Sequence, residues 1–565
     1  MKKKSVTIFV VIILVASFLR LYKLDSFPVS MFGDEMDVGY QAYSVLKTGN
    51  DYYGNFMPLH FHSLAEWRTP LYIYSVVPTV AIFGISPLGV RLPAAVFGIL
   101  GIVAFYFLVS EISKKYLNTD YKLLATVASF LLAINPWHIQ YSRAAFEVTE
   151  LLFFLILGLL FLFRSFKNGK LLWISALAFA LTPWVYSTAK LFTPLLLAFL
   201  VFVFRKEVFR LPRKYLVYAV CALALVGGPI AYSTVFGGGG QRFSYISVFS
   251  DPTIEHEVGV ARDIDSWGNS LPSRALHNKF VIWSEAIAGN ILQSYSTSFL
   301  FVDGDLNLRH SIEDMGMFYK PEFFALLLGI VYFFSRKADS KIKLFFLFWL
   351  VAGVLPSAIT RDGGNHATRL ILILLPLVFL ISSGAVFLSK NRVIFFAYSM
   401  LLLLFFIIYQ HQYWVHNPTY SERWWHYGWE EAVEAIKSVE QDFDKVVIST
   451  ADEPPWIFFA GAYEYPPEKW QAQFPLEQKV TLEGFGEVSH IDKFYFGSPA
   501  GLQMYDWGKV LDKEMLYLAS IKEVGVNLIR EPERTPGDLV LLKSIAFPSG
   551  EPAFYLFTGR RSDEN

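Results

Sequence analysis

Carboxylate side chains that could take up a proton gather in one short segment near the N-terminus. Asp34 and Glu35 follow Gly33 directly, and a third acid, Asp37, comes two residues later. A carboxylate placed beside a hydroxyl group can act as a general base. Asp34 and Glu35 are therefore the first candidates for catalytic residues.

Basic side chains that could bind an anion occur in several later segments. Arginine can form paired hydrogen bonds with phosphate, and lysine offers it a point charge. The candidate binding residues, including one further acid and one histidine, are Arg68, Arg143, Glu147, Lys190, Arg361, His366 and Arg369.

The composition is far more apolar than that of an ordinary soluble protein. Of 565 residues, 54% are hydrophobic and only 17% are charged, whereas soluble domains are roughly 25% charged. The mean hydropathy of +0.39 argues against a disordered chain and against a purely soluble enzyme. Basic and acidic residues both number 49, so no basic excess points to a nucleic-acid partner. The single cysteine, Cys221, excludes an internal disulfide framework and any multi-cysteine metal site.

Apolar runs of nearly membrane-spanning length recur from the N-terminus to about residue 410 and then stop. A spanning helix needs about 20 mostly apolar residues. The run at 70–86 is ambiguous, because Pro70 and Pro78 weaken it as a plain span. We predict eleven spans, at 6–24, 90–110, 122–135, 149–163, 171–183, 190–204, 215–235, 318–335, 343–358, 369–388 and 393–410.

Basic residues beside the spans indicate the orientation of the chain. Lys2, Lys3 and Lys4 precede the first span, which predicts a cytoplasmic N-terminus. If 70–86 does not cross the membrane, every later basic cluster also falls on the cytoplasmic side. We therefore interpret 70–86 as an interfacial or re-entrant helix. The predicted outer loops are 25–89, 136–148, 184–189, 236–317 and 359–368.

In this topology the candidate residues collect on the outer face, near the ends of the spans. Ionisable groups at membrane depth are costly and indicate a functional site by default. For any one of them, a solvated loop charge or a structural ion pair is an equally good interpretation. Together they suit transfer of a sugar from a polyprenyl phosphate, whose tail lies in the bilayer and whose phosphate lies at its surface. A carboxylate would deprotonate the acceptor hydroxyl, and cations would stabilise the departing lipid phosphate.

The tail from residue 411 has the composition of a soluble α/β domain. Residues 424–441 have helical spacing, and 445–450, 538–547 and 553–558 have the pattern of strands. The glycine run 237–240, at the start of the longest outer loop, predicts a flexible hinge.

The motifs occur in an order that resembles a known class. An acidic pair in the first outer loop is followed by a basic residue before Pro-Leu-Tyr, an Arg-Leu-Pro segment, a Ser-Arg pair with an acid four residues on, and a late Arg before a Leu-Pro span. Here they are Asp34-Glu35, Arg68-Thr69-Pro70-Leu71-Tyr72, Arg91-Leu92-Pro93, Ser142-Arg143 with Glu147, and Arg369 with Pro376. Over residues 6–390 the chain resembles GT-C class membrane glycosyltransferases, in the branch of protein O-mannosyltransferases and the aminoarabinose transferase of lipid A.

The resemblance implies a fold and a set of roles. The fold is an α-helical polytopic membrane protein with about eleven spanning helices, formed by residues 1–410, followed by an extracytoplasmic α/β domain at 411–565. Asp34 would be the general base and Glu35 its neighbour at the acceptor. The implied partners of the donor phosphate or of acidic groups are Arg68, Lys190, Arg143 and Arg369, with Glu147 in a second acidic position.

No cofactor is expected from the sequence. His60 and His62 could bind a metal, as could the Asp-x-Asp triplets at 263–265 and 303–305. The sequence fixes no third ligand beside the histidines, and such triplets are common in turns. We therefore interpret these residues as ordinary loop polarity and predict no metal site.

The function that these observations favour is sugar transfer at the outer face of the plasma membrane. The donor would be a polyprenyl-phosphate sugar, and the acceptor a glycan, a lipid or a protein. A transporter or flippase of lipid-linked saccharides is the first alternative, although we find no internal repeat of the transporter kind. A membrane-anchored binding protein that acts through its tail is the second. The sequence names neither the sugar nor the acceptor.

Overall fold

The computed structural model describes residues 3–63, 66–117, 119–268, 270–335 and 338–560. The chain forms two compact units. Unit 1 comprises Met1–Tyr22, Leu59–Tyr72 and Pro93–Tyr413, and unit 2 comprises Lys23–Pro58, Ile73–Leu92 and Trp414–Asn565. Each unit is described by itself.

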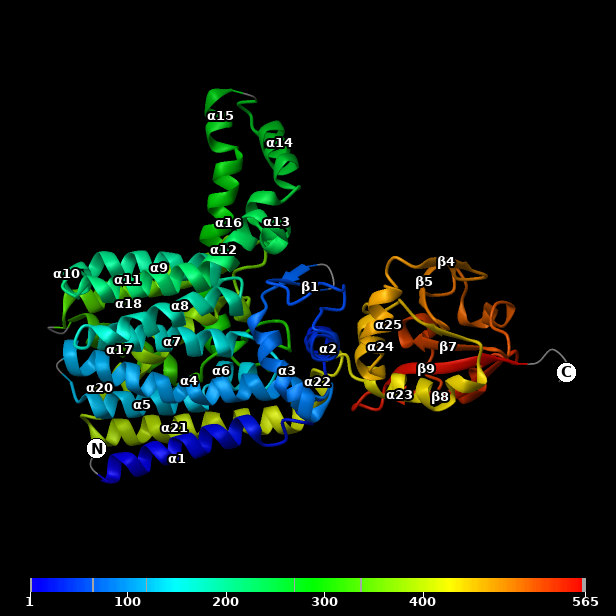
Figure 1. The fold of residues 1–565 in the computed structure, drawn as a ribbon, viewed down its shortest axis with the longest axis horizontal. Helices are drawn as coiled ribbons and strands as arrows, with labels where there is room; N and C mark the ends of the chain where they lie inside the picture. The colour runs from blue at the N-terminus through cyan, green and yellow to red at the C-terminus, as the bar shows by residue number, and fades with distance from the viewer. Residues whose placement is uncertain (1–2, 64–65, 118, 269, 336–337, 561–565) are drawn as a thin grey trace. The chain divides into compact units, whose positions relative to one another are not determined.

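Unit 1 is a bundle of helices that run side by side (Figure 1). Its longer helices are α1 (Lys3–Leu21), α4 (Pro87–Tyr116, mostly in this unit), α5 (Tyr121–Ile134), α7 (Val148–Ser165), α8 (Leu172–Val185), α9 (Ala189–Val203), α11 (Arg213–Ala222), α17 (Glu322–Ser335), α18 (Ser340–Ala358), α20 (Leu374–Leu388) and α21 (Arg392–His411). Shorter helices are α6 (Pro136–Ser142), α10 (Arg205–Val208), α12 (Gly228–Phe236) and α19 (Ala367–Leu370). One hairpin, β1 (Phe61–Ser63) with β2 (Glu66–Arg68), is antiparallel.

Polar caps start several of these helices where the apolar runs begin. The Asp120 side chain accepts hydrogen bonds from two backbone N–H groups in the first turn of α5, and Asn391 does the same for α21. Such caps satisfy donors that have no partner within the helix. Asn135 caps α6, and Pro136 follows it in the first position of that helix. The chain bends by 58° between α5 and α6 at this point.

Six described helices are long and apolar enough to cross a membrane: Pro87–Tyr116, Val148–Ser165, Arg213–Phe236, Ser340–Ala358, Ala367–Leu388 and Arg392–Tyr420. The bent pair α5–α6 makes a seventh if it counts as one span. The protein is thus a multi-pass membrane protein. The other four segments predicted as spans form helices of 10–17 apolar residues, so the number eleven stays a prediction.

The ambiguous segment 70–86 forms α3 (Leu71–Phe83), which contains Pro78. Its 13 residues extend about 20 Å along the helix axis, less than the roughly 30 Å of a bilayer core. Because four predicted spans are similarly short, length alone does not distinguish α3 from them.

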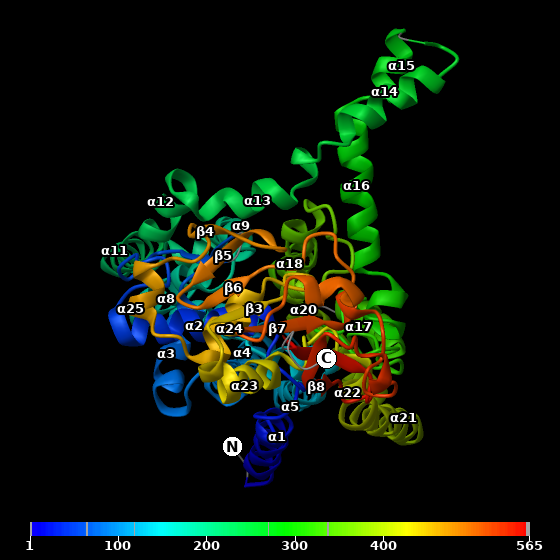
Figure 2. The same ribbon diagram turned by 90° about the vertical axis from the view of Figure 1, so that its right-hand side faces the viewer.

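The longest predicted outer loop is itself largely helical. It contains α13 (Gln241–Ile246), α14 (Ile254–Ile264), α15 (Leu271–Leu276) and α16 (Lys279–Ser294). In both views α14, α15 and α16 form an arm that projects from the bundle of unit 1 (Figures 1 and 2).

Unit 2 is built around a seven-stranded mixed sheet of order β4-β5-β6-β3-β7-β9-β8. The central strand β3 is parallel to both β6 and β7, and the other neighbours are antiparallel. The strands are β3 (Lys445–Ile448), β4 (Lys479–Leu482), β5 (Gly486–Ile491), β6 (Phe494–Phe496), β7 (Met515–Ser520), β8 (Leu539–Ala546) and β9 (Pro552–Gly559). The three strands predicted in the tail are confirmed as β3, β8 and β9. The predicted helix 424–441 is confirmed over Trp429–Val439, as α23.

Both faces of this sheet are covered, which explains why β7 and β9 are buried at every position. On one face, Trp507, Tyr517 and Phe557 belong to a core of buried side chains. On the other face, Trp429 of α23 packs on Phe554 of β9 with ring centroids 4.6 Å apart. Further helices of unit 2 are α22 (Asn417–Tyr420), α24 (Pro455–Tyr463), α25 (Pro467–Ala472) and α26 (Ile521–Val524).

Part of the first predicted outer loop folds with the tail in unit 2. Helix α2 (Gly33–Thr48) packs on α24, and a Cβ atom at Gly461 of α24 would approach the sulfur of Met36 to 2.2 Å. Gln471 of α25 donates hydrogen bonds to the Ser44 and Thr48 hydroxyls of α2, each over 3.0 Å. The acidic pair Asp34-Glu35 therefore begins a helix that is held by elements more than 400 residues later in the chain.

Candidate functional site

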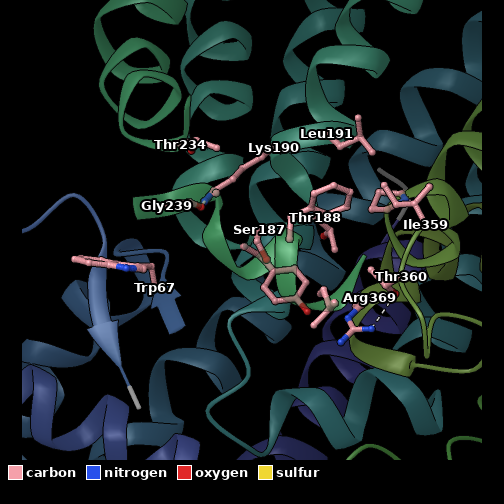
Figure 3. Close-up of a pocket in the computed structure, with 15 residues that line it drawn as sticks. Trp67, Ser187, Thr188, Lys190, Leu191, Thr234, Gly239, Ile359, Thr360 and Arg369 are labelled. Atoms are coloured by element: carbon pink, nitrogen blue, oxygen red, sulfur yellow. Dashed lines mark hydrogen bonds between the residues drawn. The ribbon is translucent and has the colours of Figure 1, made fainter. Parts of the chain in front are cut away.

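A cavity of about 360 Å³ lies within unit 1, in the range of small-molecule sites. Its walls come from the segment between α8 and α9, from the glycine run, from the end of α18 and from α19, and Trp67 of β2 also lines it (Figure 3). Two cations face apolar and hydroxyl-bearing side chains in this cavity. Its lining includes Trp67, Tyr186, Thr188, Lys190, Thr360 and Arg369.

Lys190 lies in the first turn of α9 and is held by two acceptors. Its Nζ donates to the carbonyl oxygen of Gly239 over 2.8 Å and to Nε2 of His60 over 2.9 Å. An ammonium group has no lone pair, so Nε2 of His60 accepts and its Nδ1–H donates to the Ser233 hydroxyl, 2.8 Å away. Burial and the charge of Lys190 lower the pKa of His60 to about 4. A neutral His60 therefore orients the Lys190 ammonium at neutral pH.

The glycine run lets the backbone pack closely against two aromatic rings. Gly238–Gly240 form the 3₁₀ turn η3. A Cβ atom at Gly238 would lie 2.7 Å from the Trp67 ring, and one at Gly239 would lie 2.5 Å from the His60 ring. Only glycine lets this backbone approach both rings and bring the Gly239 carbonyl to Lys190.

Arg369 of α19 is the second cation of the cavity. Its Nη1 donates to the Thr360 hydroxyl over 2.9 Å and also to the Asp362 carboxylate, while its side chain is 8% exposed. The pKa of Asp362 is low: burial acts to raise it, but the hydrogen bond and the charge of Arg369 outweigh burial. Within the described residues, Nε and Nη2 of Arg369 have no hydrogen-bond partner, so they could donate to a ligand.

The other cations predicted for the site have different surroundings. Arg68 of β2 follows Trp67 and donates from Nε to the Ser63 hydroxyl over 2.9 Å. Arg143 is fully buried, where it donates to the Tyr413 hydroxyl over 2.8 Å and to the Leu19 carbonyl over 3.0 Å. It thereby joins the α6–α7 junction to α1 and to Tyr413, which follows α21.

Two further candidate residues, Arg361 and Glu147, lie in predicted outer loops of unit 1. The exposed Arg361 donates from its side chain to the Tyr245 carbonyl, and its backbone N–H donates to the Ile246 carbonyl over 2.9 Å. These bonds hold the end of α13. Glu147 is half-buried at the N-cap position of α7. Neither residue lines the cavity.

His366 precedes α19 and lies in a separate cluster. Its ring is 5.0 Å from that of His310, measured between centroids. Nδ1 of His310 lies 2.9 Å from Oδ2 of Asp305. In the sequence, Asp305 belongs to an Asp-x-Asp triplet that we interpreted as ordinary loop polarity. His310 was not among the candidate residues.

The predicted catalytic acids both belong to α2, in unit 2. Asp34 is half-buried in the first turn, where the helix dipole favours a negative charge. Glu35 is fully buried in a bidentate ion pair with Arg91, with distances of 2.8 Å to Nε and 2.7 Å to Nη2. Arg91 also donates to the carbonyls of Pro28 and Ser30. Two of the recognised motifs, the acidic pair and Arg-Leu-Pro, are thus joined by this ion pair.

Comparison with known proteins supports the resemblance. Residues 68–232 match the family of dolichyl-phosphate-mannose-protein mannosyltransferases. The predicted resemblance to membrane glycosyltransferases is confirmed. The matched segment contains Arg68, Arg143, Glu147 and Lys190 but not the acidic pair or Arg369.

Individual relatives match at low identity. YkcB of Bacillus subtilis strain 168, which carries the name of a mannosyltransferase, is 28% identical over 182 residues, which are 32% of this chain and 23% of that protein. The oligosaccharyltransferase of Archaeoglobus fulgidus has a TM-score of 0.48 at 13% identity. The match covers 82% of this chain and 63% of the oligosaccharyltransferase chain. ArnT of Cupriavidus metallidurans has a TM-score of 0.48 at 10% identity and covers 98% of both chains.

Sequence reasoning did not select Trp67, Thr360 or the ring of His60 as neighbours of the cavity. Trp67 directly precedes the predicted Arg68, so the Arg-Thr-Pro-Leu-Tyr motif begins one residue after a side chain that lines the cavity. His60 was noticed, but as an H-x-H pair with His62. No local pattern indicates that its partner is Lys190, 130 residues later.

Proposed function

We propose that the protein is an integral-membrane glycosyltransferase that transfers a sugar from a polyprenyl-phosphate donor to an acceptor at the outer face of the plasma membrane. One observation carries the proposal: Lys190 and Arg369, from separate elements, line the same cavity in unit 1. Two cations beside apolar side chains suit a lipid phosphate, because they can neutralise its charge where water is scarce. The family match over residues 68–232 supports the same chemistry and makes a polyprenyl-phosphate mannose the first donor to test.

The reaction we propose is one inverting displacement. Asp34 accepts the proton of the acceptor hydroxyl, and that oxygen attacks the anomeric carbon of the sugar. The bond between the anomeric carbon and the phosphate oxygen breaks, and the lipid phosphate leaves with the electron pair. Lys190 and Arg369 stabilise the charge that grows on the leaving phosphate. The role of Asp34 rests on the family resemblance and on its position in the first turn of α2.

The remaining predicted residues are proposed to support this site. Arg68 follows Trp67 in β2, so it is proposed as an additional contact of the donor phosphate. Glu35, buried against Arg91, would act by positioning the start of α2. Arg143 would fix the α6–α7 junction, and Glu147 and Arg361 would shape the outer loops.

Donor turnover tests the proposal directly. Purified protein in lipid nanodiscs would receive a panel of radiolabelled polyprenyl-phosphate sugars, with a membrane extract as the source of acceptors. We expect loss of label from one donor and appearance of a labelled product. In Lys190→Met the KM for that donor should rise about ten- to a hundredfold, the equivalent of one charge-assisted hydrogen bond.

Lys279→Met is the matched control, because the Lys279 ammonium forms an exposed ion pair with Glu255 on the arm. It should leave the KM unchanged. Folded protein that turns over none of the donors would contradict the proposal and favour oligosaccharide diphosphates as donors, or transport of a lipid-linked saccharide. An equal rise of KM in both lysine variants would remove Lys190 from the donor site.

A further inference from the structure

A second group of side chains in unit 1 combines the ligands that transition metals prefer. Asp305, His310 and His366 each place one ligand atom within 4.8 Å of the other two. Asp305 and His310 follow the π-turn η5 (Ser298–Val302), and His366 precedes α19. The three ligands therefore come from two different outer loops of unit 1.

The Asp305 carboxylate is already oriented by hydrogen bonds. Its Oδ1 accepts from the backbone N–H of Asn307 and its Oδ2 from that of Ala367, each over 2.9 Å. Nδ1 of His310 lies 2.9 Å from the same Oδ2. Backbone donors that hold a carboxylate in this way are typical of the surroundings of metal ligands.

His366 provides the observation that points to a ligand. Its Nδ1 is buried and has no hydrogen-bond partner in the part of the chain that the structure describes. A buried polar atom without a partner destabilises a fold unless another group satisfies it. A metal ion would satisfy it, and the His310 ring lies 5.0 Å away between centroids.

We propose that Asp305, His310 and His366 bind one divalent transition-metal ion, for which two imidazoles and a carboxylate make Zn²⁺ the best match. Ligand atoms about 2 Å from a tetrahedral zinc ion lie roughly 3.3 Å apart, so small rotations of the two rings would close the site. Three protein ligands leave the fourth position to water. The rings of Tyr141 and Phe146 flank His310 and shield the cluster.

Binding of the metal ion would link two loops of unit 1. The metal would join residues 305–310 to the start of α19, and Arg369 lies three residues beyond His366 in α19. The ion would therefore act as a structural clamp that positions Arg369. This assigns His366 a role other than substrate contact, and it does not depend on the proposed sugar transfer.

Metal content tests the proposal without reference to activity. The protein would be purified in nanodiscs through a tag without histidines, stripped with a chelator, reloaded with Zn²⁺ and passed through a desalting column. We expect one zinc per chain in the wild type and its loss in His310→Ala and His366→Ala. Zinc should also raise the melting temperature of the wild type but not that of these variants.

His277→Ala is the matched control, because His277 pairs with Asp265 at 3.3 Å with no third ligand among the described residues. It should retain the zinc. Equal zinc content in the wild type and His310→Ala would overturn the proposal. If the alanine variants do not fold, Co²⁺-loaded wild type decides: intense visible bands at one Co²⁺ per chain support the site, and the spectrum of free hydrated Co²⁺ overturns it.

Discussion

At the scale of single residues, the surroundings of a buried charge determine whether it can bind a charged ligand. Lys190 donates to the Gly239 carbonyl and to the neutral His60 imidazole, and it lines the cavity. Glu35 and Arg91 neutralise each other in a bidentate pair. Lys190 lines the cavity, whereas Arg143 is fully buried outside its lining, so Lys190 is the better candidate for a phosphate contact.

Asp34 is expected to be essential for transfer. In Asp34→Asn the side-chain amide cannot take up the proton of the acceptor hydroxyl, so the rate of sugar transfer should fall by about a hundredfold or more. Expression and melting temperature should change little. The measurement is single-turnover transfer in nanodiscs. Asp25→Asn removes an exposed acid four residues beyond α1 and should transfer sugar normally. Full activity of Asp34→Asn would exclude Asp34 as the base.

Glu35 is expected to act through the fold. Removal of one partner of a buried ion pair costs about 3–5 kcal/mol, so Glu35→Ala should lower the melting temperature clearly. The double variant Glu35→Leu/Arg91→Met should recover part of the loss, because no lone charge stays buried. It should also keep transfer activity. A stable but inactive double variant would instead give Glu35 a direct contact with the substrate.

At the scale of elements, the cavity that we propose for the donor depends on the approach of one turn to two rings. The turn η3 brings the Gly239 carbonyl to Lys190, while His60, directly before β1, and Trp67 of β2 supply the two rings. Helix α9 begins at Ala189, so Lys190 extends from its first turn. The position of one cation thus depends on three elements that are distant in the chain.

A side chain at Gly239 should disturb this arrangement. In Gly239→Ala the new Cβ would meet the His60 ring at 2.5 Å, so turn and ring must separate. We expect a rise in the donor KM that exceeds the rise caused by Gly259→Ala, whose Cβ meets nothing within 4 Å. Donor titration of both variants measures the difference, and equal KM values would show that the close approach is not needed.

At the scale of the whole molecule, the charges beside the apolar helices predict one orientation in the membrane. The basic clusters predict that the N-terminus is cytoplasmic and that residues from 411 onward are outside. The single Cys221, which is exposed on α11, makes this prediction easy to test.

Cysteine labelling measures which side of the membrane each segment faces. In a Cys221→Ser background, Lys513→Cys in the tail should react with a membrane-impermeant maleimide in intact cells. Lys114→Cys, at the end of α4, should react only after permeabilisation. Both positions are exposed in the structure, so burial does not limit the reaction. Labelling of Lys114→Cys in intact cells would show that the orientation is opposite to the predicted one.

Local signals in the sequence determined most of the secondary structure. All eleven apolar runs contain helices, because a long apolar run has few alternatives in a membrane. The strands β3, β8 and β9 were predicted from their β-branched and aromatic residues. The strands β4–β7 were not predicted, because their short runs carry weaker signals.

The sequence by itself also determined the residue types of the chemistry: an acidic pair, several cations and their order along the chain. Only the tertiary structure decided their partners. It joined Glu35 to Arg91, brought Lys190 to His60 and Gly239, and gathered Asp305, His310 and His366. The physical reason is that hydrophobic periodicity reports which face of an element is buried. It does not report which distant side chain lies opposite, because packing of the whole unit sets that contact.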